Sequence, residues 1–208
     1  MSAFLHGPFL WYATRAAGLV TLVALSASLV LGILNAGRFA SRRWPRFLVQ
    51  GLHRNLSLLA LAFLALHLGT TVIDTYTSIG LQAAFVPFAS SYKRLWLGLG
   101  AVACDLMLVL LVTSLVRHRI GHRLWRGIHW AGYLCWPVAI AHGLGTGTDH
   151  GTRWVLALTF ACIGGVLAAI GYRAVRTIPS RRIARWRSWR SHRGGHPRSA
   201  GSHTCRAC

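Results

Sequence analysis

The sequence predicts an all-α fold, an integral membrane bundle of about five transmembrane helices, on the basis of its composition and its long apolar segments. Of the 208 residues, 54% are hydrophobic and 12% are charged. Soluble domains usually carry about a quarter charged residues of both signs, whereas here 23 residues are Lys or Arg and only 3 are acidic. Such a chain has little to keep a water-facing surface solvated. In a bilayer, lipid surrounds apolar faces instead, provided that helices satisfy the backbone hydrogen bonds.

Five apolar segments are long enough to cross a bilayer, for which a helix needs about 20 apolar residues. The segments between them are rich in Arg, Pro, Ser and Gly. The five are residues 11–34, 52–73, 95–116, 124–144 and 154–172. They divide the chain into a short external N-terminus (1–10), a transmembrane domain (11–172) and a basic tail (173–208), which we expect to be partly disordered.

Positive charges alternate between successive connections and so predict the orientation. They are concentrated in the first and third connections and in the tail, and they are sparse in the second and fourth. The residues are Arg38, Arg42, Arg43 and Arg46, then Arg117, Arg119 and Arg123, then ten arginines after Tyr172. Because cytoplasmic loops carry the Lys/Arg excess, we expect the N-terminus outside and the C-terminus inside, in a multi-pass protein of the inner (plasma) membrane. The Arg- and Trp-rich tail is expected to bind anionic lipids, and no nucleic acid partner is expected.

Four histidines on two of these helices form the candidate site. His53 and His67 lie fourteen positions apart on the second helix, and His129 and His142 lie thirteen positions apart on the fourth. At a rise of about 1.5 Å per residue, each separation is about 20 Å along the helix axis. Both helices run in the same direction, because one complete helix lies between them. His53 is therefore expected to pair with His129 near the cytoplasmic side, and His67 with His142 near the outer side.

Paired imidazoles at two levels of a membrane bundle predict two haem sites. A single intramembrane histidine could simply hydrogen-bond a neighbouring helix, but four in this arrangement match two sets of axial ligands. Two neutral imidazoles fill both axial positions of haem iron, and such an iron exchanges electrons without binding a substrate. We therefore expect two haem b groups and transmembrane electron transfer. A haem carrier or sensor with the same ligands, and a transporter whose histidines relay protons, are the alternatives.

The spacing between His129 and His142 does not place both side chains on one face of an ideal helix. Thirteen residues make about 3.6 turns, which places His142 well off the face of His129. Pro137 lies between them, and proline kinks or unwinds a helix. Our hypothesis is that a distortion at Pro137 re-aims His142, although helix tilt could do the same.

Three arginines and one aspartate are further candidates. Arg15, near the outer end of the first helix, either snorkels to the interface or pairs with a haem propionate. Arg54 and Arg126 flank the inner level, where they either contact propionates or anchor the helices on the cytoplasmic side. Asp105, in the middle of the third helix, has either a structural partner or a functional role.

The histidines and their neighbours resemble the ferric reductase-like transmembrane domain. That superfamily includes ferric reductases, the membrane half of NADPH oxidases and the haem subunit of the periplasmic methionine sulfoxide reductase system. The resemblance covers roughly residues 11–172 and rests on His53-Arg54, His67, and the run HWAGYL at 129–134 that leads to His142. It implies that the four matching histidines are haem b ligands.

The larger members of this superfamily also carry a flavin and nicotinamide module. Here the stretch that follows Tyr172 is too short for a nucleotide-binding domain. We therefore expect a separate cytoplasmic donor, either a flavin (FMN or FAD) with its reductase or a flavoprotein, and an external acceptor of unknown identity. The chain could be a reductase itself or the haem subunit that serves a periplasmic oxidoreductase. Cys205 and Cys208, a C-x-x-C pair at the end, have no assigned role.

Overall fold

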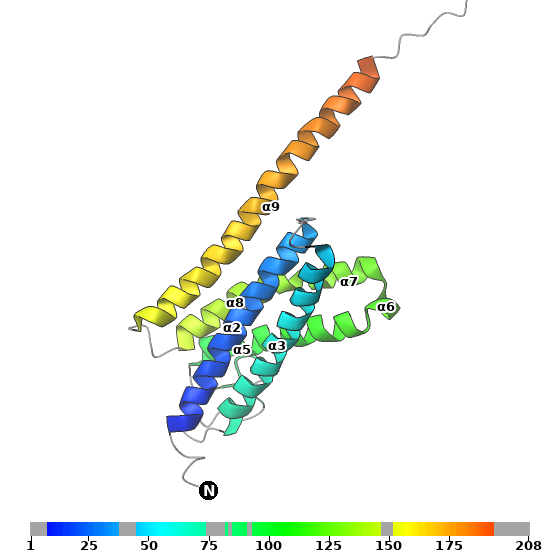
Figure 1. The fold of residues 1–208 in the computed structure, drawn as a ribbon. Helices are drawn as coiled ribbons and strands as arrows, with labels where there is room; N and C mark the ends of the chain where they lie inside the picture. The colour runs from blue at the N-terminus through cyan, green and yellow to red at the C-terminus, as the bar shows by residue number, and fades with distance from the viewer. Residues whose placement is uncertain are drawn as a thin grey trace, which may run out of the picture.

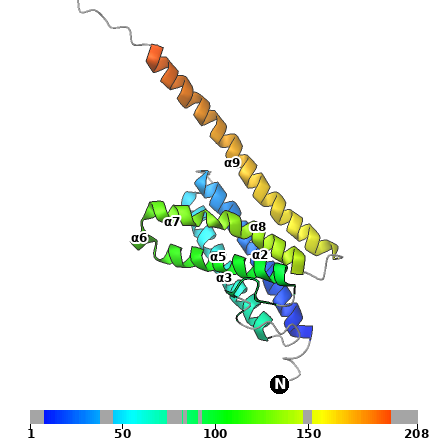
Figure 2. The same ribbon diagram turned by 180° about the vertical axis from the view of Figure 1, so that it is seen from behind.

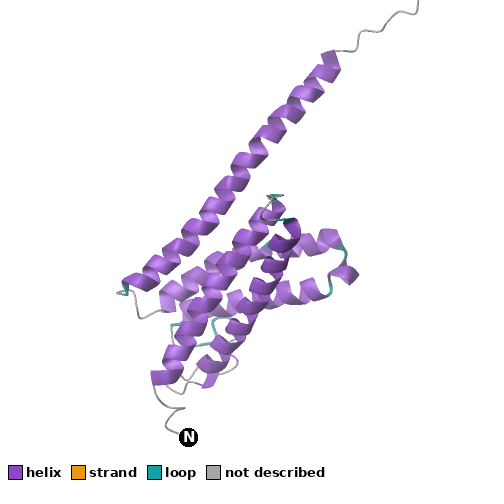
Figure 3. Ribbon diagram, in the orientation of Figure 1, coloured by secondary structure: helices purple, strands orange, loops and turns teal. Residues whose placement is uncertain are grey.

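Every regular element in the described part of the chain is an α-helix, which confirms the all-α fold class (Figure 3). The computed structural model describes residues 8–37, 45–73, 82, 85–90, 93–146 and 152–193. Most of the predicted external N-terminus lies outside these ranges, and so does the Cys205/Cys208 pair.

The helices follow the predicted apolar segments. They are α2 (Pro8–Ala36), α3 (Arg46–Ile73), α5 (Arg94–Leu115), α6 (Arg117–Ile120), α7 (His122–His129), α8 (Ala131–Thr146) and α9 (Arg153–Arg193). Four described stretches are single helices long and apolar enough to span a membrane, namely Phe9–Ala36, Arg46–Ile73, Arg94–Leu115 and Arg153–Arg176. The remaining predicted span, residues 124–144, is made by α7 and α8 in succession.

The helices associate as two antiparallel pairs with a long helix beside them (Figures 1 and 2). α2 packs along α3, α5 packs along α8, and α2 also contacts α8 and α9. The short helices α6 and α7 connect the two members of the second pair. α9 runs past α2 and continues as one helix to Arg193, beyond its apolar part (Figure 1). The boundary predicted at residue 172 is therefore not the end of a helix.

Small side chains let the two pairs approach each other. One buried cluster draws residues from four helices, Ala24, Ala60, Ala103, Met107 and Cys135. In membrane bundles, small residues at such contacts allow backbones to come close, because lipid provides no hydrophobic drive between helices. Cys135 also donates its Sγ hydrogen to the carbonyl of Ala103 at 3.4 Å. The cluster thus fixes α3 relative to α8, the two helices that carry three of the candidate histidines.

The interruption between His129 and His142 lies at Trp130, not at Pro137. α7 ends at His129, α8 begins at Ala131, and α8 continues through Pro137 to Thr146. The backbone N–H of Trp130 donates to the carbonyl of Gly127 at 3.2 Å, a three-residue bond typical of a 3₁₀ turn. A tighter turn rotates the chain more per residue, so α8 starts in a different phase from that of a continuous helix. The helix between the two histidines is therefore interrupted at Trp130, whereas α8 is continuous through Pro137.

Candidate haem-binding site

The four histidines form two cross-helix pairs, the same pairs that the helix directions predict. The ring centroids of His53 and His129 lie 6.1 Å apart with 74° between their planes. Those of His67 and His142 lie 6.4 Å apart with 80° between their planes. All four side chains are partly buried. In each pair, one histidine comes from α3 and the other from the α7–α8 segment.

The centroid distances fit one metal atom between two imidazoles. A metal–imidazole bond is about 2.0–2.1 Å and the ring centre lies about 1.1 Å behind the bonded nitrogen, so trans imidazoles have centres about 6.3 Å apart. In the described part of the chain, no group of three or more His, Cys, Asp or Glu side chains could hold a metal ion. Two protein ligands per centre suit haem, because the porphyrin supplies the other four. The residues present therefore fit a bis-histidine haem at each level.

Backbone carbonyls orient three of the four imidazoles. In each case Nδ1 donates a hydrogen bond of 2.8 Å: His53 to the carbonyl of Ser28, His67 to that of Thr14, and His142 to that of Trp96. Such a bond fixes the ring plane and the tautomer, and it leaves Nε2 as the ligand nitrogen. These three partners were not foreseen from the sequence, because any residue type can supply a carbonyl.

Glycines on the neighbouring helices make room for the same three rings. A Cβ placed on the glycine would lie 3.1 Å from Cε1 of His67 at Gly18, 3.3 Å from Cε1 of His53 at Gly32, and 2.5 Å from Cε1 of His142 at Gly100. Gly18 and Gly32 are separated on α2 by the same number of positions as His53 and His67 on the antiparallel α3. That shared spacing is a signal in the sequence from which these two glycines could have been predicted.

A buried serine network ties His53 to both helices of the first pair. The hydroxyl of Ser28 lies 3.1 Å from Nδ1 of His53 and 2.6 Å from the hydroxyl of Ser57. Ser57 donates in turn to the carbonyl of His53 at 2.8 Å. Since Ser28 belongs to α2 and Ser57 to α3, the network sets the position of the His53 ring relative to both backbones.

His129 differs from the other three histidines. Its Nδ1 is buried and has no hydrogen-bond partner among the described residues. Its ring instead stacks on the indole of Trp125, with centroids 4.9 Å apart and planes 28° apart. Trp125 lies one helical turn before His129 on α7, so the two side chains share a helix face. The sequence pattern singled out His129 but not Trp125.

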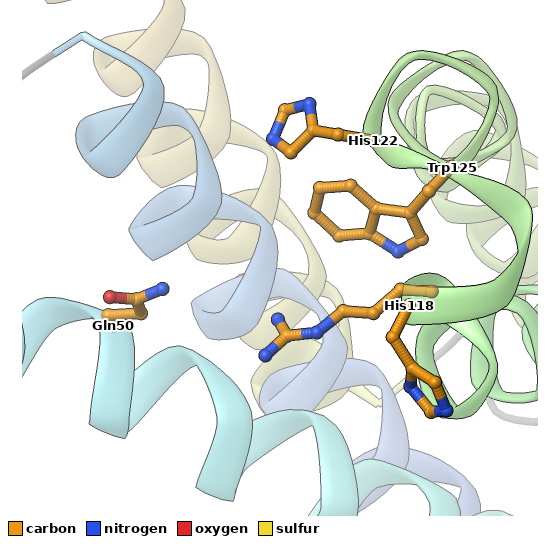
Figure 4. A pocket seen from close by; sticks show the side chains of 5 residues that line it. Gln50, His118, His122 and Trp125 are labelled. Carbon is orange, nitrogen blue, oxygen red and sulfur yellow. The ribbon is translucent and has the colours of Figure 1, made fainter.

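A pocket lies beside this stacked pair. It has a volume of about 290 Å³ and is lined by Gln50, Arg117, His118, His122 and Trp125 (Figure 4). The His122 ring lies 5.5 Å from that of Trp125, at 63°. The lining therefore joins basic groups of α6 and α7 to one aromatic wall, next to the His53/His129 pair.

The other predicted residues, Arg15, Asp105, Arg54 and Arg126, lie on α2, α5, α3 and α7. The guanidinium of Arg15 lies 4.7 Å from the centre of the Trp11 ring on the same helix, a cation–π distance. Arg54 and Arg126 are exposed, and Asp105 is half-buried on α5. Propionate contacts of the three arginines stay predictions.

A comparison with protein families identifies the family of this chain. The profile described as "Ferric reductase like transmembrane component" matches residues 17–140, more than half of the chain. The match includes His53, His67 and His129 and ends just before His142. Comparisons with curated proteins and with solved structures give no match. With four apolar helices of spanning length, the chain is a multi-pass membrane protein, and it belongs to the ferric reductase-like transmembrane family.

Proposed function

We propose that this protein carries electrons across its membrane, from a separate cytoplasmic donor to an external acceptor, through two haem b groups held by its histidine pairs. The observation that carries the proposal is the pair of centroid distances, 6.1 Å for His53/His129 and 6.4 Å for His67/His142. Both fit two imidazoles on one metal atom. When bound, each haem would supply a one-electron redox centre.

The ligand arrangement favours electron transfer over chemistry on a bound substrate. Two imidazoles at each level would occupy both axial positions and leave none open. The carbonyls that bind Nδ1 of His53, His67 and His142 hold these rings still, which keeps their ligand nitrogens in place during a change of oxidation state. Along α3, His53 and His67 are about 21 Å apart. Redox centres at these two levels would divide the path of an electron across the hydrocarbon core of about 30 Å into shorter transfers.

The basic end of the bundle supports entry of electrons from the cytoplasm. The pocket next to the His53/His129 pair presents Arg117, His118 and His122, which would attract an anionic flavin or an acidic flavoprotein. The same Arg excess is the basis for placing this end inside. The acceptor at the His67/His142 end would be ferric iron, a quinone or a periplasmic oxidoreductase.

Haem stoichiometry of the purified protein tests the proposal. We expect two haem b groups per chain by pyridine haemochrome analysis, both low-spin. His53→Ala and His129→Ala should each remove one haem, and His67→Ala and His142→Ala should each remove the other. His118→Ala, on α6 and outside both pairs, is the matched control and should retain both haems. One haem or none in the unaltered protein, or loss of the same haem from all four variants, would contradict the proposal.

A further inference from the structure

The four imidazoles are not held in the same way. For three of them, Nδ1 donates to a carbonyl at 2.8 Å. For His129, Nδ1 is buried without a partner among the described residues. An unpaired buried donor costs free energy, and a metal-bound imidazole without an oriented Nδ1 has nothing to fix its plane. Something else must set the orientation of His129.

The indole of Trp125 is the group in position to do so. It stacks on His129 at 4.9 Å with planes 28° apart, whereas the imidazole of His53 meets His129 nearly edge-on at 74°. Aromatic rings favour offset stacks of this kind. A stack restricts rotation of both rings about their χ angles, because turning either ring opens the contact.

Trp125 is itself held by other elements. Its Nε1 donates to the hydroxyl of Ser114 on α5 at 3.5 Å, the long limit of a hydrogen bond. Its other ring neighbour, His122, lies 5.5 Å away on the preceding turn. The indole is partly buried and forms the aromatic wall of the pocket, beside His122 (Figure 4). Arg117 also lines this pocket.

We propose that Trp125 is the positioning residue of His129, and that its stacked indole takes the place of the carbonyl that orients each of the other three imidazoles. The proposal rests on the assignment of His129 as a haem ligand. It makes the two centres unequal. Both ligands of the His67/His142 centre gain electron density through Nδ1–H···O=C bonds, whereas in the inner centre only His53 does. In the inner centre, therefore, the orientation of one ligand, His129, depends on the side chain of Trp125.

Substitution of Trp125 in the full-length protein tests this proposal. In Trp125→Leu, the ring of His129 loses its stack and should dissociate from iron in part of the molecules. We expect high-spin character and carbon monoxide binding at the inner centre, and a higher midpoint potential for that centre. The outer centre serves as an internal control and should keep its spectrum and potential. Trp125→Phe retains an aromatic face and should restore most of the low-spin signal.

Trp154→Leu is the matched control for removal of an indole. Trp154 is 60% exposed and lies on α9, which carries none of the four histidines. It should leave both centres unchanged. Unaltered spectra, potentials and carbon monoxide binding in Trp125→Leu would overturn the proposal, and so would equal changes at both centres. If Trp125→Leu is not recovered with its outer haem, Trp125→Met takes its place, because its long side chain fills the space without an aromatic face, and an unshifted inner centre there contradicts the proposal. Absence of haem from the unaltered protein would refute the proposed function instead.

Discussion

Gly100 of α5 lies directly against the imidazole of His142 of α8, so closely that a Cβ on Gly100 would come within 2.5 Å of Cε1 of that ring. Side-chain Cβ atoms essentially never make a contact this short. The ring is also held by its 2.8 Å hydrogen bond to the carbonyl of Trp96, on the same helix as Gly100. His142 therefore has little freedom to move away from an added methyl group.

Gly100→Ala should selectively disturb the outer centre. The methyl group forces His142 out of its position, and overpacking of this kind typically costs about 1–3 kcal/mol. We expect loss or weakened binding of the outer haem with the inner haem retained, measured by haem content and by the optical spectrum. Gly143→Ala is the control, since a Cβ at Gly143 meets nothing within 4 Å. Retention of both haems in Gly100→Ala would contradict this prediction and would show that the imidazole of His142 can move away from the added methyl group.

The angle between the ligand planes predicts an electronic signature. The imidazole planes lie 74° apart in the inner pair and 80° apart in the outer pair. A low-spin ferric haem held by two imidazoles at such angles would be strongly anisotropic. Electron paramagnetic resonance of the oxidised protein should show two such anisotropic signals. Rhombic signals of the kind given by parallel imidazoles would mean that the rings rotate when haem binds.

The orientation of the bundle can be measured with reporter fusions. Because the first and third connections and the tail carry the Arg excess, we expect them in the cytoplasm. A periplasm-active reporter fused after Arg176 should be silent, whereas the same reporter after Thr146 should be active. A cytoplasm-active reporter at the two positions should give the reverse pattern. Activity of the periplasmic reporter after Arg176 would exchange the inner and outer assignments.

The direction of electron flow can be tested with inside-out vesicles. Reduced FMN, regenerated by NADH and a flavin reductase, should reduce the haems from the cytoplasmic face in stopped-flow experiments. The rate should fall with ionic strength, because the Debye length shrinks from about 30 Å at about 0.01 M salt to about 8 Å at about 0.15 M. Haem reduction by quinol from the outer face, together with none by flavin, would show the opposite direction.

Two matched charge substitutions distinguish binding of the donor in the pocket from long-range attraction by the basic surface. Arg117 lines the pocket, and Arg119, in the same short helix, does not. Arg117→Gln and Arg119→Gln each remove one positive charge, so long-range attraction falls equally in both. We expect the flavin-dependent rate to fall further in Arg117→Gln. Equal rates in the two variants would mean that the donor does not use this pocket.

Much of the site follows from helix geometry alone. The rise per residue of an α-helix is fixed, so the spacings of His53/His67 and His129/His142 predicted two levels and the correct cross-helix pairs. The matching spacing of Gly18 and Gly32 contains the same information. The carbonyls that bind the imidazoles could not be predicted, because their position depends on how α2 and α5 pack against the histidine helices, and no residue type marks them.

The position of the helix interruption between His129 and His142 could not be predicted from the sequence either. Pro137 is the residue that propensity selects as a helix breaker, yet α8 passes through it and the interruption lies at Trp130. In a membrane bundle, neighbouring helices can tolerate a proline by satisfying the freed backbone groups. The tightened turn instead spans Gly127 to Trp130, where glycine is a weaker helix breaker than proline. The stacking of Trp125 on His129 depends on the same local geometry.

The length of α9 has a consequence for how large partners can approach. Its apolar part ends at Arg176, and the helix continues to Arg193. At a rise of about 1.5 Å per residue, this extension is about 26 Å long, close to the diameter of a small domain. In Figure 1 it stands clear of the other helices. A protein that bound near Arg193 would therefore lie about that far along the helix from the end of the apolar part. A small, diffusible carrier would fit between such a protein and the apolar part of α9.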